Sequence, residues 1–165
     1  MKLNPSANLP PVESDAGPVL ELERFLPYRL SVLTNRISTA IARVYARRFA
    51  LTVPEWRVMA VLGRFGSMSA NAVCERTAMD KVRVSRAVAR LAAASRLERR
   101  TDDADRRRAL LELTARGRAV YGEIGPLALA VEARLLAQLS AADRDDLARL
   151  LPKLEAVAAT SFAEG

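Results

Sequence analysis

The sequence predicts a mainly α-helical protein with a small β hairpin, and two observations lead to this fold class. Apolar residues recur at spacings of three and four over long stretches, which is the period of helices that bury one face. That period is lost between residues 97 and 113, where two short apolar runs flank a polar stretch. A chain of 165 residues, 50% hydrophobic and 27% charged, can bury a core in one domain or in a closely connected pair.

Residues 1–18 are predicted to form a disordered N-terminal arm, because they hold four of the eight prolines together with Ser, Asn and Asp. An arm that reaches a partner is the alternative. The first 17 residues contain one lysine and lack the apolar stretch of a signal peptide. Since no segment approaches the roughly 18 to 20 uncharged apolar residues of a membrane span, we expect a cytoplasmic protein without a membrane partner.

A long helix is predicted between Leu20 and Ala50. Its apolar stripe consists of Leu26, Leu30, Leu33, Ile37, Ile41 and Val44. Pro27 lacks a backbone N–H, so the helix either begins there, with the proline in its first turn, or bends.

The next helix is predicted to start after Thr52, whose hydroxyl can cap it. Pro54 and Glu55 follow in the first turn, as is typical of a helix start. Gly63 and Gly66 are expected to close this helix.

Two short helices separated by a tight turn are predicted next. Ser69 is the cap expected for a helix over residues 70–77, and Asp80 is the cap expected for a helix that runs to about Ala94. A helix, a tight turn and a second helix form a helix-turn-helix, whose second helix reads DNA.

A β hairpin with a charged tip is predicted after this unit. Leu97 to Arg100 and Ala109 to Leu113 are the two strands, and the tip between them forms a wing. Thr114 is then the cap expected for a helix that begins at Ala115.

The C-terminal part is predicted to be helical with two irregular points. Gly125 and Pro126 are expected to interrupt and kink the first helix, and Pro152 is expected to bend the last one, which Ser140 caps. The last helix carries an apolar side made of Leu147, Leu150, Leu151, Leu154 and Val157.

The positive charge is concentrated in residues 81–108. The whole chain has 26 basic and 19 acidic residues, a net charge of +7, and a pI near 10.4. Residues 81–108 hold ten basic and four acidic side chains, so six of the seven excess charges lie there. A solvated surface is the ordinary explanation of such a run, and a polyanion partner is the functional one.

The helical wheel favours the functional explanation. Val84, Val88 and Leu91 share one side of the predicted helix, and the opposite side is small and cationic. That opposite side consists of Val82, Arg86, Ala89 and Ala93, flanked by Arg83, Ser85 and Arg90. Arginine can donate two hydrogen bonds to guanine in a major groove, and valine can contact a thymine methyl. The sequence therefore predicts a winged helix-turn-helix plus further helices, with double-stranded DNA as partner.

In the predicted wing, Asp105, Arg106 and Arg107 are followed after five residues by Leu113 and Thr114, and then by Gly117. This pattern, D-R-R-x5-L-T-x-x-G, resembles that of the MarR (multiple antibiotic resistance) family of transcription regulators, and the resemblance extends from Leu20 to Val157. The run Val84-Ser85-Arg86-Ala87-Val88 is similar to the family's V-T-R-x-V, and Leu51-Thr52 with Trp56-Arg57-Val58 resembles its L-T-x-x-x-W-x-V. One departure is Ser95, which stands where the family usually has glycine.

The resemblance implies a set of DNA contacts. Arg107 would enter the minor groove, while Asp105 and Arg106 would hold the wing's shape. The expected DNA-binding residues are Ser69, Lys81, Val82, Arg83, Ser85, Arg86, Arg90, Arg106 and Arg107.

The resemblance also implies a homodimer and a division of the chain. Residues 19–51 would be a dimerisation helix, 52–114 the DNA-binding region, and 115–160 the C-terminal dimerisation helices. The apolar stripes at both ends agree with this, since a monomer would leave them exposed. The expected activity is repression at a pseudo-palindromic operator.

A pocket for a small aromatic carboxylate, a phenolic compound or a CoA thioester is the effector site that the resemblance implies. Candidate residues are Tyr28, Arg29, Ser31, Arg36, Trp56 and Met59. The alternative is a solvated arginine stripe, with Trp56 and Met59 in the core.

The absence of histidine, with Cys74 as the one cysteine, excludes His-dependent triads and His/Cys zinc sites within one chain. We therefore expect no enzyme activity, no metal and no cofactor. Two alternatives stay open: a protein that coats DNA without sequence preference, and a regulator that senses oxidants through Cys74, which is otherwise a small buried hydrophobe.

Overall fold

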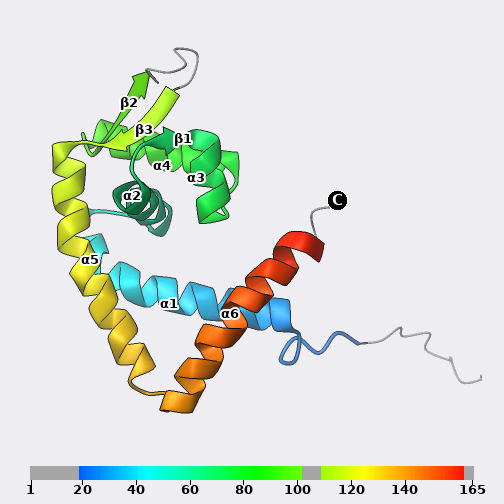
Figure 1. Ribbon diagram of the computed structural model, residues 1–165. Helices are drawn as coiled ribbons and strands as arrows, with labels where there is room; N and C mark the ends of the chain where they lie inside the picture. Colours follow the sequence, from blue (N-terminus) through cyan, green and yellow to red (C-terminus); the bar gives the residue numbers. More distant parts are fainter. Residues whose placement is uncertain (1–18, 102–108, 162–165) are drawn as a thin grey trace, which may run out of the picture. The chain divides into compact units, whose positions relative to one another are not determined.

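The computed structural model describes residues 19–101 and 109–161 (Figure 1). The predicted N-terminal arm and the tip of the predicted wing lie outside the described residues. The elements in chain order are α1 (Leu26–Phe49), α2 (Val53–Phe65), β1 (Met68–Ser69), α3 (Ala70–Thr77), α4 (Lys81–Ala93), β2 (Leu97–Thr101), β3 (Ala109–Leu113), α5 (Ala115–Leu136) and α6 (Ala141–Ser161). Contacts divide the chain into two compact units between Asn35 and Arg36, inside α1.

In the first unit, α1 begins at Leu26. A turn precedes it, in which the backbone N–H of Phe25 donates to the carbonyl of Glu21. Of the two predicted alternatives, a start with Pro27 in the first turn is therefore confirmed, and the missing N–H of the proline costs nothing there because the first N–H groups of a helix have no partner within it. Side chains from residue 19 to residue 35 are exposed, apart from half-buried Val32.

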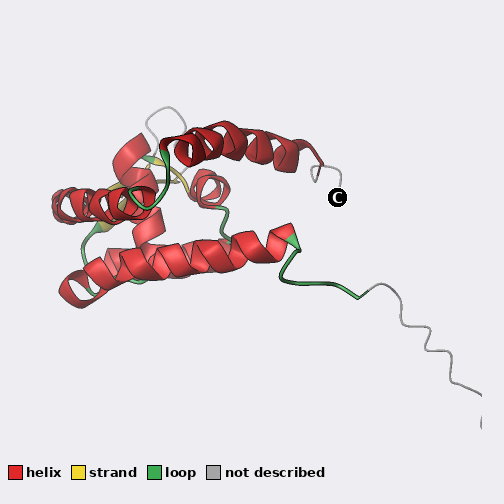
Figure 2. Cartoon of the chain, turned by 90° about the horizontal axis from the view of Figure 1, so that it is seen from below, coloured by secondary structure: helices red, strands yellow, loops and turns green. Residues whose placement is uncertain are grey.

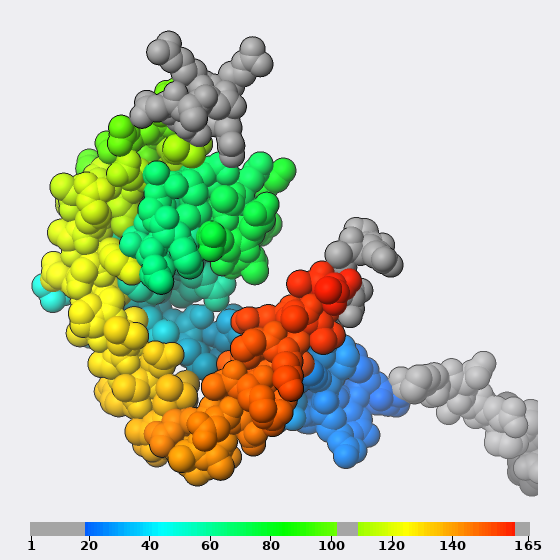
Figure 3. Space-filling model, in the orientation of Figure 1, coloured from blue at the N-terminus to red at the C-terminus, as the bar shows by residue number. Residues whose placement is uncertain are grey.

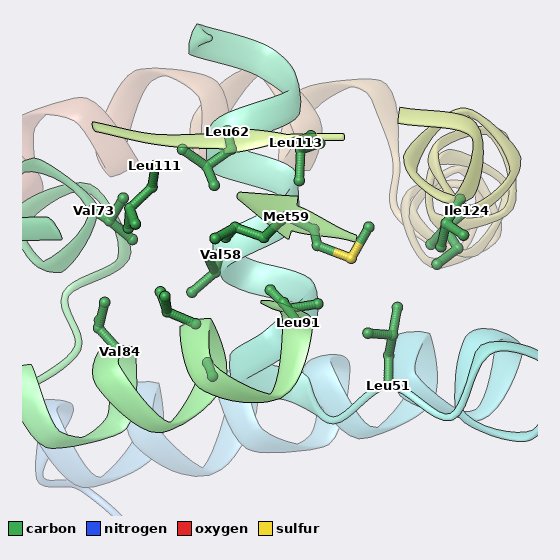
Figure 4. Close-up of a cluster of buried hydrophobic side chains, with 14 of the residues drawn as sticks. Leu51, Val58, Met59, Leu62, Val73, Val84, Leu91, Leu111, Leu113 and Ile124 are labelled. Carbon is green, nitrogen blue, oxygen red and sulfur yellow. The ribbon is translucent and has the colours of Figure 1, made fainter. Parts of the chain in front are cut away.

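The second unit has one hydrophobic core, built from the end of α1, from α2, α3, α4 and α5, and from the sheet (Figure 4). Its largest fully buried side chains are Tyr45, Met59, Leu91, Ile124, Val58, Val73 and Val84. The core therefore joins the predicted helix-turn-helix to the hairpin strands and to the start of α5.

The capping residues predicted from the sequence are confirmed. At α2 the backbone N–H of Thr52 donates to Glu55 Oε2 at 2.9 Å, and the Thr52 hydroxyl accepts from the backbone of Glu55, which is a capping box. Ser69 Oγ accepts from Ala72 N at 3.2 Å, and Asp80 Oδ1 accepts from Arg83 N at 2.8 Å. The starts of α2, α3 and α4 are thus set locally.

Gly63 does not end α2, contrary to the prediction. The helix continues to Phe65 and closes at Gly66, which has a φ of 81°. Gly63 lies under Tyr121 of α5, where an added Cβ would stand 2.7 Å from ring carbons. Its role is therefore to let an aromatic ring pack against the helix.

The hairpin is confirmed as part of a three-stranded antiparallel sheet in the order β1-β3-β2. Leu97 pairs with Leu113 and Thr101 with Ala109, while the two-residue β1 adds Met68 opposite Leu111. Leu111 and Leu113 face the core. One face of the sheet thus closes the core that holds α4.

The predicted interruption at Gly125 and Pro126 is absent, since α5 runs unbroken from Ala115 to Leu136 (Figure 1). Helices make up most of the described chain (Figure 2). Proline in a helix removes one hydrogen bond and crowds the carbonyl four residues earlier. That earlier residue is Gly122, which lies within the same unbroken helix. α6 likewise continues through Pro152.

No single helix in the described part is long and apolar enough to cross a membrane. Only α5 and α6 taken together would be long and apolar enough, and a bend of 118° separates these two helices.

The backbone of Arg96 approaches Gly117 so closely that a side chain has no room there. Replacement of Gly117 by alanine should therefore destabilise the protein by more than about 2 kcal/mol. The new Cβ would stand 2.0 Å from the carbonyl oxygen of Arg96, which is backbone and has little freedom to move. Gly122→Ala is the control: the site is open, so alanine should stabilise α5 by about 0.5 to 1 kcal/mol. Urea unfolding measures both, and equal effects would contradict this account.

Ser95 should be replaceable by glycine with a gain of about 0.5 to 1 kcal/mol. Its φ is 55°, and it closes a Schellman motif in which Arg96 N donates to Leu91 O and Ser95 N to Ala92 O. In Ala89→Gly, at an exposed position inside the same helix, we expect a loss of about 1 kcal/mol instead. Thermal or urea unfolding tests the opposite signs.

Candidate nucleic-acid interface

The apolar side of α4 is packed in the core, as the helical wheel predicts. Val84, Val88 and Leu91 are buried, and Ala87 joins them. They lie against Val58 and Met59 of α2 and against the sheet (Figure 4). Rotation of α4 about its axis would expose these side chains, so the direction of its opposite face is fixed.

The opposite face of α4 is open to solvent. Val82 is 59% exposed, and Lys81, Arg83, Ser85, Arg86 and Ala89 are exposed around it. Contact with water does not stabilise an exposed valine. Small uncharged residues between arginines therefore suit a surface that another molecule covers. The free N–H groups in the first turn of α4 add a positive potential at the same end.

The cations of α4 differ in their partners. Arg83 lies 3.3 Å from Asp80, and both side chains are exposed, so the pair is worth at most about 1 kcal/mol and can open. Arg90 lies 3.6 Å from Glu55, which is buried. Lys81 and Arg86 make no ion pair within the described residues.

Ser69 is the last residue of β1 and the N-cap of α3. It is half-buried, and its hydroxyl accepts from Ala72 N at 3.2 Å. The cap leaves the hydroxyl proton free to donate.

Asp105, Arg106 and Arg107 lie outside the described residues, but the strands that carry the tip are well anchored. Arg100 and Arg118 lie 3.2 and 3.4 Å from the carboxylate of Glu112. Thr114 donates to Ser95 O at 2.8 Å and caps α5 by accepting from Gly117 N at 3.0 Å. The base of the hairpin is therefore tied both to the end of α4 and to α5.

Arg99 is a candidate that the sequence reasoning missed. With Lys81 and Ser85 it lines a cavity of about 220 Å³ between α3, α4 and the sheet. The sequence contained a signal for Arg99, because side chains alternate between the two faces of a strand. Arg99 follows buried Leu97 by two residues and therefore lies on the same face of β2. Cys74 lines the same cavity, half-buried and packed against the core, which fits the small-hydrophobe interpretation.

The effector candidates are divided between the two units. Tyr28, Arg29 and Ser31 are exposed in the first unit, and Arg36 is exposed at the start of the second. Trp56 stacks between Tyr45 and Tyr121, at centroid distances of 5.6 and 6.0 Å. Met59 is completely buried.

Tyr45 belongs to the same aromatic cluster and is buried at the end of α1. Burial raises its pKa to about 12, with Arg57 opposing the rise and Glu55 adding to it. The hydroxyl is therefore a neutral hydrogen-bonding group at any physiological pH.

Comparisons with known proteins agree with this geometry. Residues 51–108 match the model of the MarR family, and no curated protein matches the chain. The chain is 28% identical to BpsR of Bordetella bronchiseptica, a structure described as showing regulation of DNA binding by 6-hydroxynicotinic acid; the match covers 84% of this chain and 98% of that one, with a TM-score of 0.72.

A MarR/EmrR family regulator from Acinetobacter sp. ADP1 is 26% identical, over 82% of this chain and 96% of that one, with a TM-score of 0.75. A MarR family regulator from Silicibacter pomeroyi DSS-3 is 28% identical, over 84% and 96%, with a TM-score of 0.68. The helices and the three-stranded sheet of this chain are therefore arranged as in MarR-family transcription regulators, and its residues 51–108 match the model of that family.

Proposed function

We propose that the protein is a sequence-specific, ligand-responsive regulator, most simply a repressor, that binds a pseudo-palindromic operator as a homodimer. One observation carries the proposal: α4 has its apolar side fixed in the core, which leaves Arg86 and Val82 exposed on the opposite side. A helix of this kind fits a major groove.

The roles of the cations follow from their positions. Arg86 is suited to donate two hydrogen bonds to a guanine, and Val82 to contact a thymine methyl. Lys81, Arg83 and the missed Arg99 lie around them and are suited to phosphates. Arg106 and Arg107 of the wing keep the roles that the family motif implies.

Homodimerisation is supported by apolar surface left open in the chain. Along α6, five apolar side chains are between 40% and 59% exposed: Leu147, Leu150, Leu151, Leu154 and Val157. Apolar side chains that stay exposed to water do not stabilise the protein. A two-fold dimer would bury this stripe and would bring two recognition helices together. The half-sites of the operator would then be about 10 bp apart, or a multiple of that.

A small aromatic acid or its CoA thioester is the effector that we propose. Support comes from BpsR, whose DNA binding is described as regulated by 6-hydroxynicotinic acid. The coupling required is modest, because a preference of about 3 kcal/mol for a dimer with misplaced recognition helices weakens DNA binding about 150-fold. Tyr28, Arg29, Ser31, Arg36 and Trp56 stay candidates, whereas buried Met59 would require its helix to move.

Arg86→Ala is expected to reduce the ratio of operator to random-DNA affinity by about 5- to 150-fold, because one good bidentate base contact discriminates by about 1 to 3 kcal/mol. Arg107→Ala should weaken binding to the operator as well. Fluorescence anisotropy with an operator selected from a random duplex library by the wild-type protein measures both.

Arg149→Ala is the control, since Arg149 lies on α6 and pairs with Asp146 at 2.6 Å. It should leave the ratio unchanged. If the wild-type protein selects no palindrome and binds all duplexes alike, the protein coats DNA without sequence preference instead.

Leu150→Lys combined with Leu154→Lys should convert the dimer into a monomer and abolish operator binding at concentrations where the wild-type protein is saturated. Two lysines would place charge in the apolar stripe. Asp145→Lys, on the other side of α6, is the control and should stay dimeric. Analytical ultracentrifugation measures the mass, and a dimeric double variant would contradict the assignment of this interface.

A further inference from the structure

Glu55 is the one charged side chain that is buried within the described residues, at 4% exposed. It lies in the first turn of α2. One carboxylate oxygen, Oε2, accepts from Thr52 N at 2.9 Å, and the other, Oε1, lies 3.6 Å from Nη1 of Arg90 on α4. A buried carboxylate is costly unless it is paired and hydrogen-bonded, and these two partners fulfil both conditions.

Arg90 occupies a flank of α4 and not the face opposite the core. At 100° per residue it lies about 110° from the centre of the buried side, whereas Arg86 lies about 150° away. Its own side chain is 72% exposed, yet its guanidinium lies beside a carboxylate of the neighbouring helix. The same flank carries Arg83, which also turns to a carboxylate, that of Asp80.

The Glu55–Arg90 contact joins α2 to α4 by a charge pair. Glu55 is at the start of α2, and Arg90 is in the last turn of α4. The core fixes the rotation of α4 through Val84, Val88 and Leu91. A charge pair at the edge of this packing adds a restraint on the tilt of α4 against α2, because the guanidinium must stay near a carboxylate that the capping box holds in place.

We propose that Glu55 and Arg90 form a positioning pair, in which Arg90 acts on operator recognition through Glu55 rather than by contacting a phosphate. The proposal rests on the operator binding proposed above. It assigns Arg90, a member of the expected DNA-contact set, to the orientation of the recognition helix.

Glu55→Gln gives the sharpest test, because two explanations predict opposite signs. Glutamine keeps an oxygen that can accept from Thr52 N but removes one negative charge, which by itself favours binding to DNA. If the pair positions α4, this variant should instead bind the selected operator about fivefold more weakly, while random duplex is bound as well or better. Glu98→Gln, an exposed site on β2, removes the same charge and should weaken neither.

Arg90→Ala and the double variant Glu55→Gln/Arg90→Ala complete the experiment. Each is titrated by fluorescence anisotropy with selected operator and random duplex over a series of KCl concentrations. We expect Arg90→Ala to lose about fivefold in operator affinity with an unchanged salt slope, and the double variant to lose no more than the single ones. Arg90→Lys should recover part of the loss.

Two results would overturn the positioning pair. One is a slope of the logarithm of the binding constant against the logarithm of the salt concentration that becomes less steep by about 0.9 for each Arg90 removed, as expected for a phosphate contact. This result would have to come together with normal operator binding by Glu55→Gln. The other is an operator-to-random ratio that stays at the wild-type value in every variant, which would leave the pair with a role in stability alone.

Failure of the proposed function is distinguishable from failure of the pair. If the wild-type protein selects no operator, the same four proteins are compared by urea unfolding. Losses of stability that add in the double variant show that the two side chains are independent and overturn the pair. A double variant as stable as the less stable single variant shows that the two side chains interact, so that only their role in operator recognition fails with the proposed function.

Discussion

Burial of the apolar side of α4 is the constraint on which the rest of this structure depends. Val84, Ala87, Val88 and Leu91 lie in one core with α2 and the sheet, and burying each larger aliphatic side chain contributes about 1.5 to 3 kcal/mol. A rotation of α4 would forfeit most of that free energy. Hydrophobic packing on the buried side of α4 therefore directs the cationic face outward. The residues that fix this direction are not the charged residues themselves.

The positive charges of the DNA-binding region serve two purposes. Arg90 and Arg100 lie beside the carboxylates of Glu55 and Glu112, respectively, whereas Lys81, Arg86 and Arg99 line open surface or a cavity. The first group ties helices and strands together, and the second is available to a polyanion. Net charge thus overstates the number of cations that are free to bind DNA, because part of it is already neutralised within the fold.

The ends of the chain contrast with this compact core. Between residues 19 and 35, and separately along α6, apolar side chains stand exposed. In the space-filling view of Figure 3, α6 is coloured orange to red and its side chains are seen at the surface. Exposed stripes of this length are unusual for a stable monomer, which is why we attribute them to a subunit interface, as proposed above. The hydrophobic effect, which fixes α4 in the core, would therefore also drive formation of the proposed homodimer.

Local chemistry decided much of the fold from the sequence alone: Thr52, Ser69, Asp80 and Thr114 start four helices because a capping oxygen acts on a backbone N–H within three residues. Helical periodicity likewise identified the buried side of α4. Tertiary structure alone decided the rest. Tyr121 packs on Gly63, which stays helical, and Arg90 turns to Glu55, 35 positions away. Each depends on atoms brought together only by folding, which no local pattern encodes.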